Sequence, residues 1–107
     1  LRYVDIDSCG ICNKCKQPIY LAETTFDVGQ SWKATTATEW LAHAANLPSF
    51  LIFYKVNENR EVISLRIKQL TPIKDRKEFL LKPEAWVQAM ELLQDRHNLV
   101  CKKRDVA

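Results

Sequence analysis

The sequence predicts a mixed α/β fold: a β-sheet of about four strands with helices packed on it, in the order β-β-α-β-β-α. Segments with the two-residue alternation of a strand lie on both sides of a segment with the helical repeat. Residues 50–56 form a continuous apolar run, which is typical of a strand covered on both faces. The chain has 107 residues, of which 47% are hydrophobic, so we expect residues 1–107 to form a single domain around one core.

The chain is expected to begin with a strand and a cysteine-rich loop. Residues 2–7 alternate so that Asp5 and Asp7 share one face of the strand. Residues 8–18 hold three cysteines, include Gly10, which suits a tight turn, and end at a proline. We therefore expect a loop over residues 8–18 that leads to the second strand.

The second strand and the first helix follow this loop. Residues 19–25 alternate as a strand that carries Glu23 after apolar neighbours, and such a local inconsistency is typical of functional positions. Thr36 and Glu39 match a capping box, which predicts a helix over residues 36–46. Its expected buried stripe consists of five residues at helical spacing: Ala37, Trp40, Leu41, Ala44 and Ala45.

Two more strands are expected in the second half of the chain. Residues 50–56 should lie in the middle of the sheet, because both of their faces are apolar. Residues 61–70 alternate clearly, and outward-facing Arg66 and Lys68 would protect an edge strand with charge. Residues 71–81 show no regular pattern and are expected to be irregular.

Four cysteines are candidates for a structural metal site, since no export signal is visible that would favour disulfides. Cys12 and Cys15 have the spacing of two thiolates on one tetrahedral zinc ion, and Cys9 adds a third at the same interval. A last helix, expected over residues 83–98, would bring back Cys101 as the fourth ligand. Such a site would join the two ends of the chain and stabilise a small domain.

Several alternatives for the cysteine cluster stay open. The fourth ligand could also be His97, His43 or a residue from a second copy of the chain. The spacing also suits a 4Fe-4S cluster held by four cysteines, which ranks second after zinc. Cys12 and Cys15 could also form a redox dithiol, although such a pair usually opens a helix and this one reads as a turn.

Acidic residues on the first two strands suit the hydrolysis of phosphodiester bonds. Asp5 or Asp7, together with Glu23, would supply the hard oxygen ligands that Mg²⁺ or Mn²⁺ prefers. In a hairpin these side chains could converge, and a backbone carbonyl near Thr24 could complete the ligand set. The chemistry also needs a cation that stabilises the developing charge.

This arrangement resembles the PD-(D/E)XK nuclease superfamily, which includes restriction enzymes and Holliday-junction resolvases. The family pattern has an acid near one strand and (D/E)-X-K on the next, followed by a helix and a further strand. Asp7, or Asp5, matches the first acid, and Glu23-Thr24-Thr25 stands where (D/E)-X-K is expected. Thr25 thus replaces the lysine, and Lys33, just before the helix, is the candidate to take its role.

The resemblance covers most of the chain by element order. It implies a restriction-endonuclease-like core with an inserted zinc-knuckle-like loop. It also implies a metal-dependent nuclease that hydrolyses DNA, with Asp7, Glu23, Lys33 and Asp5 as catalytic residues. Asp7 and Glu23 would hold the catalytic Mg²⁺ or Mn²⁺. By analogy with resolvases and restriction enzymes, a homodimer is expected.

Four residues are candidates for contact with nucleic acid, and a net charge of +3 permits such a polyanionic partner. Lys14 and Lys16 lie in the cysteine loop, and Gln30 lies in the connection before the first helix. Trp32, beside the candidate catalytic lysine, could stack on a base. We therefore expect a nucleic acid as the partner, and the resemblance to the nuclease superfamily implies DNA.

A second function stays open beside the nuclease. Because Thr25 replaces the lysine, the chain could be a non-catalytic module with a degenerate nuclease fold and a structural zinc site, which binds nucleic acid or protein. No apolar run approaches a membrane span, so no membrane partner is expected. We expect a cytoplasmic protein, located in the host cytoplasm if it is viral.

Overall fold

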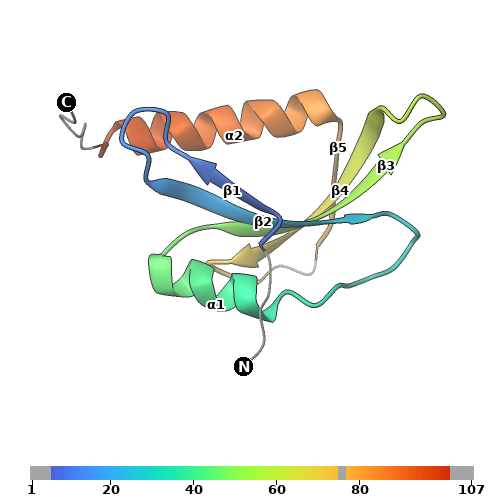
Figure 1. Ribbon diagram of the computed structural model, residues 1–107, viewed down its shortest axis with the longest axis horizontal. Helices are drawn as coiled ribbons and strands as arrows, with labels where there is room; N and C mark the ends of the chain where they lie inside the picture. The colour runs from blue at the N-terminus through green and yellow to red at the C-terminus, as the bar shows by residue number, and fades with distance from the viewer. Residues whose placement is uncertain (1–5, 75–76, 102–107) are drawn as a thin grey trace.

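The computed structural model describes residues 6–74 and 77–101, which fold into a five-stranded mixed sheet between two helices (Figure 1). The strands lie side by side in chain order: β1 (Ser8–Ile11), β2 (Pro18–Phe26), β3 (Ser49–Val56), β4 (Val62–Thr71) and β5 (Phe79–Leu81). The helices are α1 (Thr36–Ala45) and α2 (Pro83–Asn98). The mixed α/β class is thus confirmed, with five strands in place of about four.

The sheet has one parallel pair, β2 with β3, and its other neighbours are antiparallel. A parallel pair needs a crossover connection, and α1 supplies it on one face of the sheet. α2 covers the opposite face, as Figure 1 shows. Neither helix in the described part of the chain is long and apolar enough to cross a membrane.

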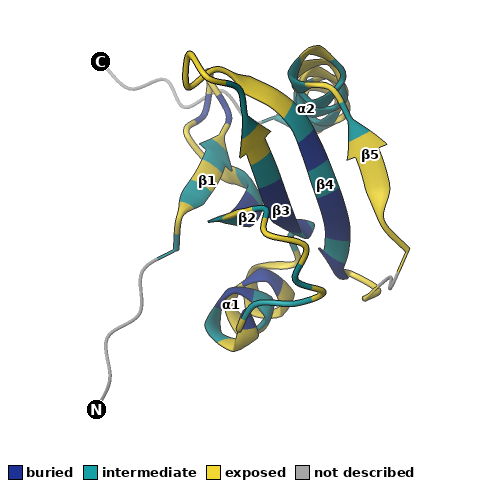
Figure 2. Cartoon of the chain, turned by 90° about the vertical axis from the view of Figure 1, so that its right-hand side faces the viewer, coloured by how far each residue is buried: buried dark blue, intermediate teal, exposed yellow. Residues whose placement is uncertain are grey.

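The core has two clusters, because alternate residues of β3 point to opposite faces of the sheet. Ile52 packs on the α2 side, in a cluster that Trp86 of α2 covers. Leu51 and Phe53 pack on the opposite side, where Trp32 closes the cluster. Figure 2 shows that the buried residues concentrate in β3 and β4. The prediction that residues 50–56 form a central, doubly covered strand is confirmed.

The first strand differs from its prediction. β1 begins at Ser8, inside the stretch predicted as a loop, and the described residues of the predicted strand 2–7 lie outside it. Gly10 explains the difference, because a side-chain carbon at this position would overlap the ring of Tyr20 on the paired strand. The glycine therefore permits close strand packing where we expected a turn.

The buried face of α1 is also different. Trp40 is 75% exposed and Leu41 is 49% exposed, so the predicted apolar stripe is wrong. The helix instead buries Thr38 and Ala42. The residue before the helix is Thr35, whose hydroxyl donates to the Glu39 carboxylate at 2.7 Å, so the predicted box with Thr36 is wrong as well.

β4 is not an edge strand, because β5 pairs with it inside the stretch that we expected to be irregular. The side chains of Arg66 and Lys68 are only 12% and 8% exposed. Arg66 donates to both the Asp27 carboxylate and the Gln30 carbonyl, and its guanidinium lies 3.9 Å from the centre of the Phe53 ring. These basic residues therefore anchor the connection before α1 to the sheet.

Candidate functional site

Three predicted catalytic residues come together on the α1 side of the sheet. The Lys33 ammonium nitrogen Nζ lies 3.3 Å from Asp7 Oδ2 and 3.4 Å from Glu23 Oε2. It also donates to the backbone carbonyl of Thr24 at 3.0 Å. Asp7 precedes β1, Glu23 lies on β2, and Lys33 lies in the connection before α1. We call these residues, with the Thr24 carbonyl, the acid–lysine cluster.

The Glu23 carboxylate is buried and needs polar partners, since an unpaired buried charge is costly. Thr38 of α1 donates its hydroxyl to Glu23 Oε1 at 2.5 Å, and Lys33 approaches the other oxygen. Thr38 therefore faces the sheet from α1 and supplies a hydrogen bond to the buried Glu23 carboxylate. Sequence reasoning missed Thr38, because its burial depends on the tertiary contact with Glu23.

Asp7 is held by the backbone of the neighbouring strand. Its Oδ2 atom accepts the Thr24 N–H at 2.8 Å and lies 3.4 Å from the Thr24 hydroxyl. The hydrogen bond from the Thr24 N–H is the main reason that the pKa of Asp7 lies below its usual value, and Lys33 adds to this despite some burial. Asp7 is therefore ionised at neutral pH.

The acid–lysine cluster contains two carboxylates and one backbone carbonyl whose oxygen atoms could act as metal ligands. Such ligands suit Mg²⁺ or Mn²⁺, which is bound through one or two carboxylates with substrate and water completing the shell. Asp5, the other predicted acid, lies outside the described residues. Within residues 6–74 and 77–101, the metal-compatible groups of at least three His, Cys, Asp or Glu residues do not include this cluster.

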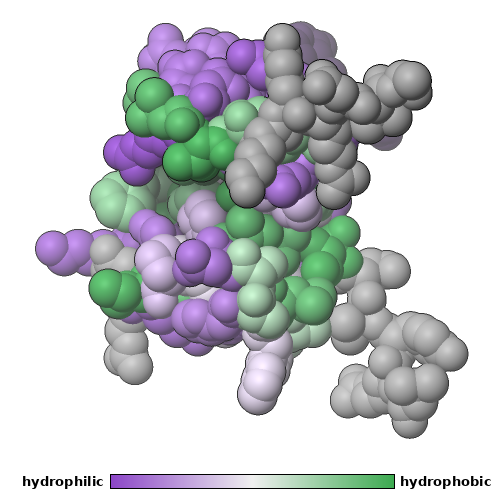
Figure 3. Space-filling model, turned by 90° about the vertical axis from the view of Figure 1, so that its left-hand side faces the viewer, coloured by the Kyte–Doolittle hydropathy of each residue, from purple (hydrophilic) through white to green (hydrophobic). Residues whose placement is uncertain are grey.

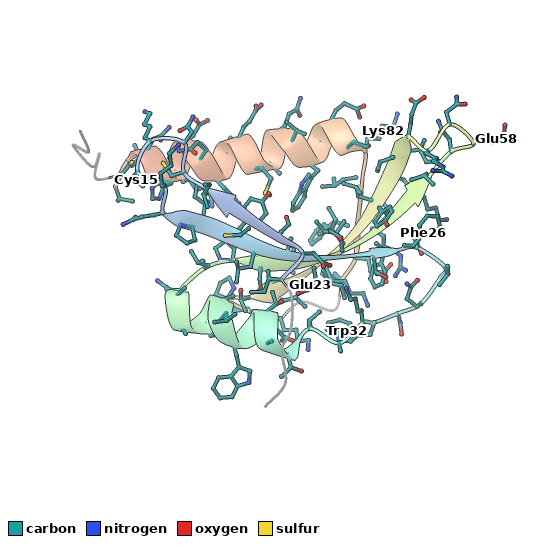
Figure 4. All side chains as sticks on the ribbon, in the orientation of Figure 1. Cys15, Glu23, Phe26, Trp32, Glu58 and Lys82 are labelled. Atoms are coloured by element: carbon teal, nitrogen blue, oxygen red, sulfur yellow. The ribbon has the colours of Figure 1, made fainter. Side chains whose placement is uncertain are left out.

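The predicted nucleic-acid contacts lie in two different places. Trp32 is half-buried on the α1 side, where Figure 4 shows it on the same side of the sheet as Glu23. Gln30 uses its amide within its own loop, donating to the Phe26 carbonyl and accepting the Val28 N–H. Lys14 and Lys16 lie in the cysteine turn at the other end of the molecule.

A second group of side chains forms at that end, where the β1–β2 turn meets the end of α2 (Figure 4). The ligand atoms of Cys12, Cys15, His97 and Cys101 all lie within 4.8 Å of one another. The Sγ atoms of Cys12 and Cys101 are 3.7 Å apart, and Cys15 Sγ lies 3.2 Å from His97 Nε2. We call this set the Cys3His group, and it is compatible with a structural metal such as zinc.

The Cys3His group differs from the predicted ligand set at one position. Cys9 is exposed on β1, where its backbone pairs with Leu21, and it does not belong to the group. His97, which we considered only as an alternative, takes its place. The even spacing of three cysteines suggested one loop, but the strand separates the first cysteine from the other two.

Local backbone structure positions the four ligands. Two backbone hydrogen bonds close the turn after Cys12. The Cys12 N–H donates to the Gln17 carbonyl, and the Lys16 N–H donates to the Cys12 carbonyl. Lys16 adopts a positive φ of 66° at the end of this turn. At the end of α2, the Val100 N–H donates to the His97 carbonyl, which brings Cys101 back toward the helix.

The surroundings shift the pKa values of two thiols of the group in opposite directions. Burial opposes ionisation of Cys12, but donors from the backbone of Cys15 and Lys14 and from the Gln94 side chain lower its pKa to about 5. Burial and the neighbouring thiols raise the pKa of Cys101 to about 11. The Cys12 thiol therefore ionises readily, whereas the Cys101 thiol would lose its proton only when a cation binds.

The surface around this end of the molecule is mixed. Figure 3 shows mainly hydrophilic residues over the upper part of that face, and hydrophobic patches interspersed with hydrophilic residues over its middle and lower part. Leu41 on α1 is among the exposed apolar residues, as are Leu99 and Val100 after α2.

Comparison with known proteins found no match to this chain among family models, curated proteins or solved structures. The fold and its two side-chain groups define a mixed α/β protein with a Cys3His group compatible with a structural metal. The acid–lysine cluster lies apart from that group, on the α1 side of the sheet.

Proposed function

We propose that this protein is a Mg²⁺- or Mn²⁺-dependent nuclease that hydrolyses phosphodiester bonds of DNA at the acid–lysine cluster. The observation that carries the proposal is the position of Lys33, whose ammonium contacts Asp7, Glu23 and the Thr24 carbonyl. On this proposal, Lys33 takes the role of the lysine in the PD-(D/E)XK pattern from the connection before α1, in place of the lysine that is missing at Thr25.

Each residue of the cluster has a distinct part in the proposed chemistry. Asp7, Glu23 and the Thr24 carbonyl would hold the ion, which would polarise the phosphate and activate water. Lys33 would stabilise negative charge that develops on the phosphate oxygens. Thr38 keeps the Glu23 carboxylate in one orientation. Without an ion, the Lys33 ammonium offsets part of the negative charge of the two carboxylates and limits the cost of burying Glu23.

The first test is the Lys33→Met variant, assayed for cleavage of labelled single-stranded, duplex and branched DNA with Mg²⁺ or Mn²⁺. Loss of a group that stabilises transition-state charge should lower the rate by about 10²- to 10³-fold. Lys55→Met is the matched control, because Lys55 is exposed on β3. Equal cleavage by Lys33→Met and the wild type would contradict the proposed role of this lysine.

A non-catalytic binding module is the second candidate function. It is favoured by the Lys33 ammonium between the two acids and by the absence of a third acid from the described part of the cluster. On this account the protein binds nucleic acid or protein without cutting it. The binding module then predicts no cleavage by the wild type with either ion.

We also propose that the ion of the Cys3His group is zinc. Thiolate sulfurs that share one tetrahedral zinc ion, each about 2.3 Å from it, lie about 3.8 Å apart. The separation of 3.7 Å between the Cys12 and Cys101 sulfurs fits this value. Three thiolates and one imidazole form a closed structural zinc set, whereas a 4Fe-4S cluster usually takes four cysteines. The expected homodimer and cytoplasmic location stay predictions.

A further inference from the structure

A hollow with a basic and aromatic lining opens beside the acid–lysine cluster. It has a volume of about 330 Å³ and is lined by Ser31, Trp32, Lys68 and Lys74. This volume is at the lower end of the range of about 300 to 1,000 Å³ that is common for small-ligand sites. We call it the Trp32 pocket. Neither the proposed catalytic residues nor the Cys3His group uses it.

Two ammonium groups flank the indole ring of this pocket. Lys68 Nζ lies 4.9 Å from the centre of the Trp32 ring, and Lys74 Nζ lies 4.3 Å from it. Lys68 is fixed, since its side chain is 8% exposed and donates to the Ser31 carbonyl at 2.6 Å. Lys74 is 48% exposed and pairs with Glu39 at 3.3 Å, so it is free to exchange that partner for an incoming anion.

Both charged residues that line the pocket, Lys68 and Lys74, are basic. Their carboxylate partners are Glu78, at 3.5 Å from Lys68, and Glu39, at 3.3 Å from Lys74, and neither carboxylate lines the pocket. Glu78 also binds Arg66 at the shorter distance of 2.8 Å. A lining whose charged groups are both ammonium groups favours an anionic ligand.

The strand register places this pocket on the same face of the sheet as the catalytic acid. Glu23 pairs with Leu51, and Leu51 pairs with Lys68, so these three residues form one row across β2, β3 and β4. Two strand spacings separate the ends of the row by about 10 Å. Neighbouring nucleotides of one strand can bridge this distance of about 10 Å. Trp32 also directly precedes Lys33 in the sequence, which keeps the pocket close to the acid–lysine cluster.

We infer, on the basis of the proposed nuclease function, that the Trp32 pocket binds a nucleotide next to the one that is cut. Its base stacks on the Trp32 ring in place of the exposed Lys74 ammonium, which turns to the phosphate, and Lys68 adds its charge from the wall of the pocket. A base inside a duplex is stacked on its neighbours and is not free to enter such a pocket. The substrate is therefore DNA with a single-stranded segment beside the cleavage site.

The experiment measures binding of a fluorescent single-stranded oligonucleotide without added divalent ion, so that binding is observed without cleavage. Lys74→Gln should weaken binding about threefold to tenfold and lower the slope of log affinity against log salt by about 0.7. Trp32→Leu should weaken binding roughly tenfold, whereas Trp32→Phe should retain most of it because the ring remains. Circular dichroism confirms that each variant is folded.

Matched controls are available for both changes. Lys55→Gln removes an exposed lysine from β3, and Trp40→Leu removes the exposed tryptophan of α1. Both should bind as the wild type does. Unchanged binding by folded Lys74→Gln and Trp32→Leu would overturn the inference, as would equal affinity for a blunt duplex and a single strand.

The outcomes separate this inference from the proposed function. If the wild type cleaves DNA but the pocket variants bind normally, the pocket assignment fails alone. If the wild type does not cleave but binding depends on Trp32 and Lys74, the nuclease proposal fails and the pocket stands as a binding site.

Discussion

A single ammonium group, that of Lys33, connects three segments of the chain that are distant in sequence. It contacts an acid before β1, an acid on β2 and a carbonyl of β2 from a loop before α1. Arg66 holds that loop in place through the carbonyl of Gln30 and the carboxylate of Asp27. The position of the candidate catalytic lysine thus depends on a basic residue of β4.

Thr38 gives a test of the acid–lysine cluster by stability. Its hydroxyl is buried and donates to Glu23, so Thr38→Val keeps the shape but removes a hydrogen bond to a buried carboxylate. We expect the free energy of unfolding to fall by about 1 to 3 kcal/mol, measured by urea denaturation. The matched control Thr36→Val, exposed at the start of the same helix, should change it by less than about 0.5 kcal/mol. Equal stability of the two variants would show that the hydrogen bond contributes little.

Cys9 and Cys15 give a matched pair of variants that tests the proposed zinc site. Cys15 belongs to the Cys3His group, whereas Cys9 is exposed on β1 and lies outside it. Metal analysis of the purified protein should find one zinc per chain in the wild type and in Cys9→Ser. Cys15→Ser should lose most of its zinc. Zinc that depended on Cys9 and not on His97 would support the ligand set predicted from spacing.

At the scale of elements, α2 is held by few core contacts. None of its residues is fully buried, and Trp86 is its main contact, packing against the rings of Tyr20 and Phe50. The Cys3His group adds a link between the end of this helix and the β1–β2 turn. A metal at this group would therefore fix the helix at the end opposite to its first turn.

Removal of the metal should loosen α2 before it loosens the central strands. After treatment with a chelator, we expect faster amide hydrogen exchange in the last turns of α2 and in the turn after Cys12. Exchange in β3, the buried centre of the sheet, should change less. The Cys9→Ser protein should respond as the wild type does. A uniform increase across all elements would contradict a local clamp.

Elements with strong local patterns were predictable, and those that depend on tertiary partners were not. β2, β3, β4 and α2 match their predicted ranges within one residue at each end. Trp40 was predicted to be buried, but it is exposed. The helix buries Thr38 instead, because its hydroxyl donates to Glu23, and helical periodicity carries no information on this tertiary contact. β5 has three residues and is defined only by its pairing with β4.

The candidate site follows the same division. Asp7, Glu23 and Lys33 were named from the sequence because their chemistry and order along the chain carry a signal. His97 was only an alternative, since its approach to the cysteines depends on how α2 packs against the β1–β2 turn. Cys9 was predicted as a ligand because it has the same spacing as the other two cysteines. It instead lies on β1, a strand that Gly10 permits.

At the scale of the whole molecule, the two side-chain groups occupy different regions. The acid–lysine cluster lies between the sheet and α1, and the Cys3His group lies at the far end of α2 (Figure 4). The cysteine turn begins only five residues after Asp7 in the sequence, but in the fold it lies apart from the acid–lysine cluster. A structural role for the metal and a catalytic role for the acids are therefore independent claims.

The most direct measurement is cleavage of single-stranded, duplex and branched DNA with Mg²⁺ or Mn²⁺ by the wild type and by Glu23→Gln. Glu58→Gln is the matched control, because Figure 4 shows Glu58 at the far turn between β3 and β4. We predict cleavage by the wild type and the control, with preference for DNA that has a single-stranded segment, and none above background by Glu23→Gln. Absence of cleavage by folded, zinc-loaded wild type with either ion would contradict the nuclease assignment, as would full activity of Glu23→Gln.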